Sequence, residues 1–146
     1  AFDGFNIDVV LPCQRCAQCG EEIIKGSDSE RAERAVAFAL AQHAPVSGGA
    51  FRHMRKVLGV SRAEMATFAG VDPATITRWE KQERATDRAA WELVATIVAE
   101  VGVDSIDDVK SKTLERLRLR LMVDKLNEVT RVKHHKLALE TGRLAS

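Results

Sequence analysis

Three cysteines near the start of the chain have a spacing that predicts chemistry: Cys13, Cys16 and Cys19. The pair Cys16 and Cys19, followed by a glycine, is typical of a zinc knuckle, in which backbone N–H groups of a turn support two thiolates on a tetrahedral ion. Structural zinc normally takes four ligands, usually from a second, separate pair, and the sequence contains none. The three cysteines therefore predict zinc as a candidate cofactor, with reduced thiols that hold no metal as the alternative.

The other polar residues show none of the patterns expected of an enzyme. The sequence has no nucleophile–base constellation, no phosphate-binding loop and no tyrosine, and its carboxylates have no paired spacing. We therefore expect a protein that binds rather than catalyses.

The segment 61–80 has the local signals of two short helices joined by a tight turn. Ser61 and Glu64 form a capping box that starts the first helix. Gly70 is placed for the positive φ of the turn. Asp72 caps the second helix, and the proline that follows occupies the first helical position, where a missing N–H costs nothing. This is the pattern of a DNA-binding helix-turn-helix.

Helical periodicity gives the second helix two different faces. Ile76 and Trp79 fall on one face and are expected to pack inward. Ala74, Thr75 and Arg78 fall on the opposite face.

The segment before the helix-turn-helix predicts a hairpin followed by a linker helix. Apolar residues alternate from Phe5 to Leu11, which predicts a strand, and residues 21–24 are expected to return as a second strand. Ser27 and Glu30 are expected to form a capping box that opens a helix through Leu40. The break at residues 45–49 is the expected domain boundary.

The fold class predicted from these signals is mainly α. A five-helix helix-turn-helix domain is expected at residues 47–104, after a small hairpin or ribbon module with its linker helix at residues 1–46. A helical extension with a leucine stripe at Leu114, Leu117 and Leu121 is expected at residues 105–146, for dimerisation or partner binding.

Charge is unevenly distributed along the chain, although the net charge is only +1. Residues 51–84 carry seven basic and four acidic side chains, and residues 105–146 carry ten and six. Residues 1–50 carry four basic and seven acidic side chains. A phosphate backbone responds to local basic surface, so the middle and the tail suit DNA. The acidic first third would better suit a basic protein partner.

The composition is that of a soluble globular protein, with 45% hydrophobic and 29% charged residues. No run approaches the roughly 20 apolar residues that span a bilayer. The start of the chain lacks the basic region and apolar core of a signal peptide. We therefore expect a cytoplasmic protein with no membrane association.

A set of residues within positions 50–100 carries a family resemblance: Phe51-Arg-His-Met-Arg55, Leu58-Gly-Val-Ser61, Ala66, Gly70-Val71 and Thr75-Ile-Thr-Arg-Trp-Glu80. Together they resemble the Xre/Cro family of helix-turn-helix repressors. The resemblance implies five helices, with the third in the major groove of double-stranded DNA. It places four residues against base edges: Pro73, Ala74, Thr75 and Arg78. Arg78 is expected to recognise guanine with two hydrogen bonds, and Thr75 or Ala74 to touch a thymine methyl.

The same resemblance, together with the helix N-terminus, predicts phosphate contacts from Ser61, Arg62, Thr77 and Lys81. Members of the family often have glutamine where Arg62 stands. Glu80 is expected to be structural and to pair with Arg55 inside the domain.

A second resemblance covers the flank. A turn with glycine, an apolar strand, Cys16-Ala-Gln-Cys19-Gly20 and a helical linker into an Xre domain are similar to the MqsA-type antitoxins of toxin–antitoxin systems. That resemblance implies a homodimeric repressor of a palindromic operator that autoregulates its own operon and binds a basic toxin. The alternative is a stand-alone regulator from a phage or mobile element, without a toxin partner.

Overall fold

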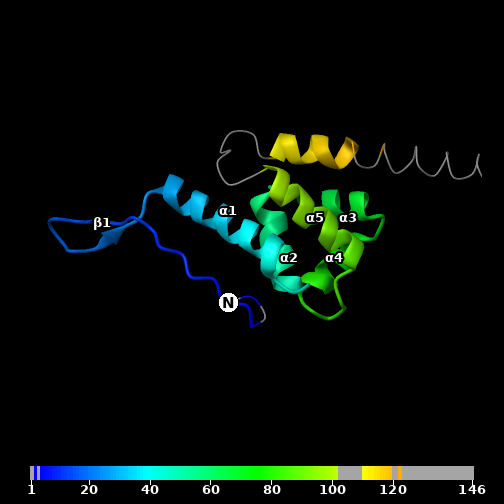
Figure 1. Cartoon of the computed structure of the whole chain (residues 1–146), viewed down its shortest axis with the longest axis horizontal. Coiled ribbons are helices and arrows are strands. Elements are labelled where there is room, and N and C mark those ends of the chain that lie inside the picture. The colour runs from blue at the N-terminus through cyan, green and yellow to red at the C-terminus, as the bar shows by residue number, and fades with distance from the viewer. Residues whose placement is uncertain (1, 3, 102–109, 120–121, 123–146) are drawn as a thin grey trace, which may run out of the picture.

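The computed structural model describes residue 2, residues 4–101, residues 110–119 and residue 122, and within them it is mainly helical (Figure 1). A short antiparallel hairpin precedes the helices and consists of β1 (Gln14–Arg15) and β2 (Glu22–Ile23). The labelled helices are α1 (Gly26–His43), α2 (Gly48–Val57), α3 (Arg62–Ala69), α4 (Pro73–Glu80) and α5 (Arg88–Val101). Residues 110–119 are also helical. The predicted mainly α fold with a small N-terminal hairpin is confirmed.

One hydrophobic core holds the labelled helices together. α2 lies against α1, α4 and α5, while α3 packs on α4. Phe51 and Met54 of α2 and Ile76 of α4 are fully buried. The Phe51 ring meets the indole of Trp79 edge to face, with ring centroids 5.9 Å apart, a geometry that aromatic quadrupoles favour. The inward positions predicted for Ile76 and Trp79 are thus confirmed, and the contact with Phe51 fixes α4 against α2.

Helix α1 shares this core, which differs from the linker role expected of it. Ala37 and Leu40 are fully buried, and α1 packs on both α2 and α5. The expected boundary near residue 46 therefore falls between two helices of the same bundle. The predicted capping box at Ser27 and Glu30 is wrong, because the helix already begins at Gly26 and its N-cap, Lys25, has no side-chain cap hydrogen bond.

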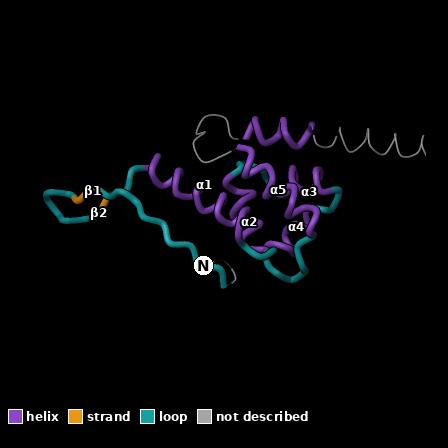
Figure 2. The backbone as a smooth tube through the Cα atoms, in the orientation of Figure 1, coloured by secondary structure: helices purple, strands orange, loops and turns teal. Residues whose placement is uncertain are grey.

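The hairpin lies at the outer end of α1, away from the bundle (Figure 2). Its strands are two residues each and pair Gln14 with Ile23, so the strand predicted between Phe5 and Leu11 is wrong. Residues 6–13 have no strand partner, and Val10 is 96% exposed. Phe5 instead packs against the helical core. The alternating apolar residues therefore belong to an extended segment without a partner strand, in which Phe5 and Ile7 pack against the bundle while Val9 and Val10 are exposed.

The helix at residues 110–119 lies beside α5 and reaches the start of α3 (Figure 1). Leu117 is buried in the common core, and Leu114 is half-buried. Lys110 Nζ lies 3.3 Å from Glu64 Oε1, and Arg116 Nη1 lies 3.1 Å from Glu100 Oε2. Leu121 and residues 123–146 of the predicted extension lie outside the described residues. No helix among the described residues is long and apolar enough to cross a membrane.

Candidate nucleic-acid interface

The start of α3 has the capping box predicted from the sequence. Ser61 N–H donates to Glu64 Oε2 at 2.8 Å, and Glu64 N–H donates to Ser61 Oγ at 3.1 Å. The hydrogen bond from the Ser61 N–H lowers the pKa of Glu64, and nearby Lys110 acts in the same direction. Two of the free N–H groups at this helix end are thereby satisfied.

The turn between α3 and α4 also follows the prediction. Gly70 has φ 66° and ψ 32°, in the left-handed region that favours glycine, and its N–H donates to Ala66 O. Asp72 caps α4, because its Oδ1 accepts from the Ala74 N–H at 2.8 Å. Pro73 then takes the first helical position.

Helix α4 presents one face to solvent, with the charged Arg78 beside small and apolar residues. Pro73, Ala74 and Arg78 are exposed and Thr75 is half-buried, while the opposite face is anchored in the core. The structure therefore brings together the four residues predicted to read bases, on the outer side of one short helix. Their contact with DNA stays a prediction.

The four residues predicted to bind phosphate have different surroundings. Ser61 is exposed, but its hydroxyl already serves the capping box. Thr77 is half-buried, and its hydroxyl donates to Pro73 O at 3.2 Å. Lys81 is exposed at the C-terminal end of α4. Arg62 is engaged by Glu80, a pairing that was not predicted from the sequence.

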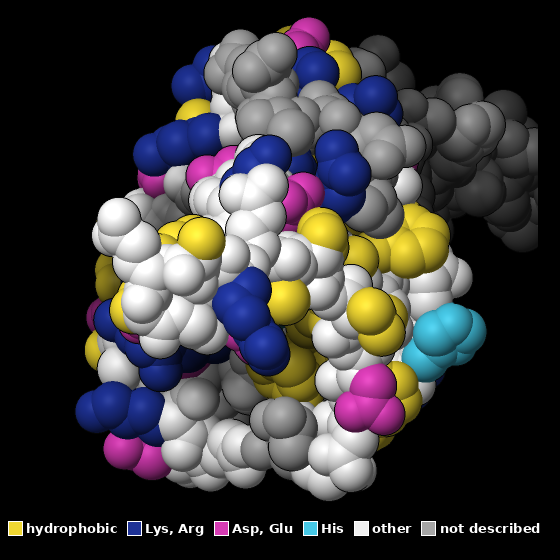
Figure 3. Space-filling model, turned by 90° about the vertical axis from the view of Figure 1, so that its left-hand side faces the viewer, with side chains coloured by type: hydrophobic (Ala, Val, Ile, Leu, Met, Phe, Trp, Pro, Cys, Tyr) yellow, Lys and Arg dark blue, Asp and Glu magenta, His cyan; other side chains and the backbone are white. Residues whose placement is uncertain are grey.

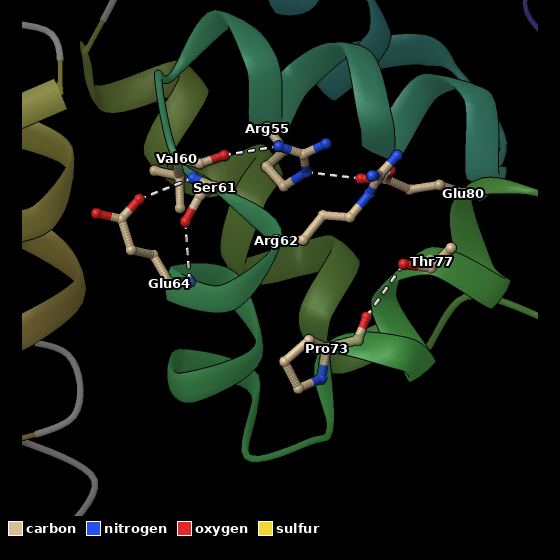
Figure 4. A network of polar contacts seen from close by, with 8 residues as sticks. All are labelled: Arg55, Val60, Ser61, Arg62, Glu64, Pro73, Thr77 and Glu80. Carbon is tan, nitrogen blue, oxygen red and sulfur yellow. Dashed lines mark hydrogen bonds and ion pairs between the residues drawn. The ribbon is translucent and has the colours of Figure 1, made fainter.

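Three charged side chains from three helices meet behind the α3–α4 turn (Figure 4). Arg55 of α2 donates from Nε to Glu80 Oε1 at 2.6 Å and from Nη1 to Val60 O at 2.7 Å. Arg62 of α3 donates from Nε to Glu80 Oε2 at 2.7 Å. The predicted pair of Arg55 and Glu80 is confirmed, and the carboxylate also holds a second guanidinium.

Burial makes this cluster sensitive to any loss of charge. The side chains of Glu80 and Arg55 are 1% and 7% exposed, while that of Arg62 is 41% exposed. Burial alone would raise the pKa of Glu80, but hydrogen bonds and charge from Arg55 and Arg62 outweigh it and lower that pKa. Glu80 is therefore held as a carboxylate inside the domain.

Residues 30–99 match the family model of the antitoxin Xre-like helix-turn-helix domain. This segment of the chain is therefore similar to a helix-turn-helix domain of the Xre type. No curated protein and no solved structure matches the chain. The MqsA-type resemblance is not tested by these comparisons and stays a prediction. The matched segment begins within α1, which agrees with the burial of Ala37 and Leu40 of α1 in the core of the helical bundle.

The loop after α4 places a further cation, Arg84, near α4, and this residue was not singled out from the sequence. Gln82 adopts a positive φ of 60°, and its N–H donates to Trp79 O at 3.0 Å. Glu83 N–H donates to Arg78 O at 2.9 Å, so α4 ends in a Schellman motif. The exposed Arg84 follows directly and lines a shallow cleft together with Thr75. Arg84 belongs to the basic segment 51–84, and the excess of basic residues in that segment is the sequence signal that could have identified it.

The hairpin end of the molecule shows a mixed surface. Lysine and arginine side chains are interleaved there with acidic and hydrophobic ones and do not form one continuous basic patch (Figure 3). The side chains of Arg15 and Glu22 form an exposed pair across the hairpin, 3.4 Å apart. This end is therefore a poor candidate for binding a phosphate backbone.

The cysteine turn has the backbone geometry of a knuckle. Cys16 N–H donates to Glu21 O at 2.8 Å, Gly20 N–H donates to Cys16 O at 2.9 Å, and Gly20 has φ 74°. The backbone N–H groups of Cys19 and Gln18 lower the pKa of the Cys16 thiol, which is how a knuckle supports a thiolate.

The described residues do not complete a metal site at this turn. Among the described residues, no three histidine, cysteine or carboxylate side chains come together in a group that could hold a metal ion. Cys13 therefore does not complete the pair of Cys16 and Cys19. His53 Nε2 lies 3.1 Å from the carbonyl oxygen of Glu33 in the middle of α1, and its ring packs on Phe2. The described residues thus do not fit a closed four-ligand zinc site.

Proposed function

We propose that this protein is a homodimeric, sequence-specific transcriptional repressor. The observation that carries the proposal is the two-sided packing of α4. Ile76 and Trp79 are buried against α2 and α3, so Arg78 and Ala74 on the other side are held rigidly outward. A rigid outward face on a short exposed helix is what major-groove reading requires.

The proposed reading mechanism follows from the side chains on that face. Arg78 hydrogen-bonds the O6 and N7 acceptors of a guanine, and each good contact of this kind discriminates by about 1–3 kcal/mol. Ala74 and Thr75 make apolar contact with a thymine methyl. Lys81 and the start of α3 meet phosphates on either side of the groove. Two copies of α4 in a dimer then read half-sites about 34 Å apart.

We further propose that the regulator is an antitoxin that controls its own operon. Support comes from the matched family model, which describes an antitoxin domain. The hairpin adds a surface for a protein partner, because Ile23 and Ile24 are exposed beside the acidic Glu21 and Glu22. A basic toxin with an apolar contact patch complements that surface in charge and in hydrophobicity.

One experiment tests both parts of this proposal. The protein is expressed with its neighbouring reading frames, purified, and footprinted on the DNA upstream of its own gene. A protected palindrome supports the repressor, and a small basic protein that co-purifies supports the antitoxin. Protection without a partner favours the stand-alone regulator. No preference for the upstream DNA over unrelated duplex of equal length would overturn the repressor.

A further inference from the structure

Glu80 is the point where the helices that would meet DNA are joined. It lies in the last turn of α4, yet its carboxylate receives one guanidinium from α2 and one from the first residue of α3. Each carboxylate oxygen accepts one of these hydrogen bonds, Oε1 from Arg55 and Oε2 from Arg62. The first turn of α3 is therefore tied to the end of α4 by side chains as well as by the turn at Gly70.

The charges of this cluster do not cancel. Two guanidinium groups share one carboxylate, so one positive charge remains. Arg55 is buried and also satisfies Val60 O, whereas 41% of the Arg62 side chain is exposed. The excess charge is thus at the surface, on Arg62, at the N-terminal end of α3, where the helix dipole favours an anion.

The way in which Arg62 is held determines what it can still bind. Its hydrogen bond to Glu80 uses Nε. Among the described residues, Glu80 is the only hydrogen-bond or ion-pair partner of Arg62, and the hydrogen bond between them is made by Nε. A guanidinium fixed by one edge keeps its remaining donors in a fixed plane, which suits an oxygen pair of a phosphate better than a freely rotating cation does.

We propose that Glu80 is a positioning residue for DNA binding, which holds Arg62 through Nε so that its terminal nitrogens bind a backbone phosphate. Arg62 is then the binding residue, and Glu80 acts only through it. The same carboxylate sets the distance between this phosphate contact and the base-reading face of α4. The inference rests on the proposed DNA-binding function, and it adds a reason for arginine at position 62.

The test compares Arg62→Ala with Arg62→Lys in the full chain. Both variants keep the buried pair of Arg55 and Glu80, so the domain is expected to fold, and its melting temperature reports this directly. Lysine keeps the charge but has no Nε edge for the carboxylate to hold. The matched control is the same pair of substitutions at Arg15, which forms an exposed ion pair with Glu22 on the hairpin.

Affinity is measured over a range of salt concentrations, on a duplex that the wild-type protein selects from a randomised library and on a scrambled duplex. Arg62→Ala is expected to lose affinity for both, on the order of tenfold, as for a charge-assisted hydrogen bond. The slope of log K against log salt is expected to fall by about 0.9, the value for one phosphate. Arg62→Lys is expected to behave like Arg62→Ala, and both Arg15 variants like the wild type.

Three results would overturn the inference. If Arg62→Lys binds like the wild type, charge alone suffices and Glu80 does not position it. If Arg62→Ala binds like the wild type, Arg62 does not meet a phosphate. If both variants melt at a much lower temperature, and the fraction of unfolded protein accounts for the whole loss of affinity, the role of Arg62 is structural. If instead the wild type prefers no duplex over another, the proposed repressor function is wrong. The inference about Arg62 can then still be tested, because the slope of log K against log salt is also measured on the scrambled duplex.

Discussion

Gly48 lies directly against the carbonyl oxygen of Trp79, so that the first residue of α2 touches the last turn of α4. A Cβ built at position 48 would overlap this oxygen and would also lie 3.2 Å from Gln82 Cγ. Because the obstacle is backbone, it cannot move aside as a flexible side chain would. Glycine at this position therefore lets the start of α2 pack closely against the end of α4.

The first prediction concerns this contact. Gly48→Ala is expected to lower the free energy of unfolding by about 1–3 kcal/mol, the usual cost of overpacking a core. The measurement is urea unfolding followed by circular dichroism. Gly26→Ala is the control, because a Cβ there meets nothing within 4 Å and the glycine begins α1. That control is expected to stabilise by up to about 1 kcal/mol. Equal effects at the two positions would contradict the account of Gly48.

The parts of the fold that follow from local rules could be predicted from the sequence. The capping box at Ser61, the left-handed Gly70 and the N-cap at Asp72 depend on residues within a few positions of each other. The inward face of α4 follows from helical period alone. Periodicity therefore predicted which residues of α4 face outward, whereas the base-reading role of Pro73, Ala74, Thr75 and Arg78 was implied by the family resemblance and stays a prediction.

The parts that depend on distant neighbours were not predictable in the same way. The second guanidinium on Glu80 joins residues 18 positions apart in the chain, and no local pattern specifies it. The alternation after Phe5 is a strand signal only where a partner strand exists, and none pairs with residues 6–13. The small residues of α1 gave no sign that both α2 and α5 would pack on this helix. The helical domain was therefore expected to begin at residue 47, after α1, although α1 belongs to its core.

The second prediction tests the base-reading role of Arg78. Arg78→Ala is expected to weaken binding to the selected duplex by about 1–3 kcal/mol and to leave binding to a scrambled duplex nearly unchanged. Stability is expected to be unaffected, because Arg78 is exposed. Fluorescence anisotropy on both duplexes measures the ratio. Lys81→Ala is the comparison, because loss of a phosphate contact weakens both duplexes alike. If Arg78→Ala shows that uniform loss as well, Arg78 is a phosphate contact.

The third prediction uses the lowered pKa of Glu80. A carboxyl whose pKa is lower in the folded state stabilises the fold at pH values above its ordinary pKa, which is 4.5 for glutamate. This contribution is lost as the pH falls through the lowered pKa of the folded state. Removing the charge with Glu80→Gln leaves Arg55 buried without its partner, which costs about 3–5 kcal/mol near neutral pH. The difference in unfolding free energy between wild type and Glu80→Gln is therefore expected to shrink below pH 4.5.

Carboxyl ¹³C titration by NMR gives an independent measurement if Glu80→Gln does not fold. The Glu80 resonance of the wild type is expected to titrate below the ordinary carboxyl pKa. A midpoint above that value would mean that burial, and not the two arginines, controls the carboxylate, and the account of the cluster would then be wrong.

The fourth prediction concerns the cysteine turn. The hairpin lies at the outer end of α1, and neither Cys16 nor Cys19 is part of the buried core. Metal stabilises a fold only where its ligands join the elements that unfold. A strong chelator is therefore expected to leave the melting temperature of the bundle and its DNA affinity unchanged, and Cys16→Ser with Cys19→Ser is expected to do the same. A lower melting temperature with chelator in the wild type, but not in the double variant, would show that metal on this turn supports the helices.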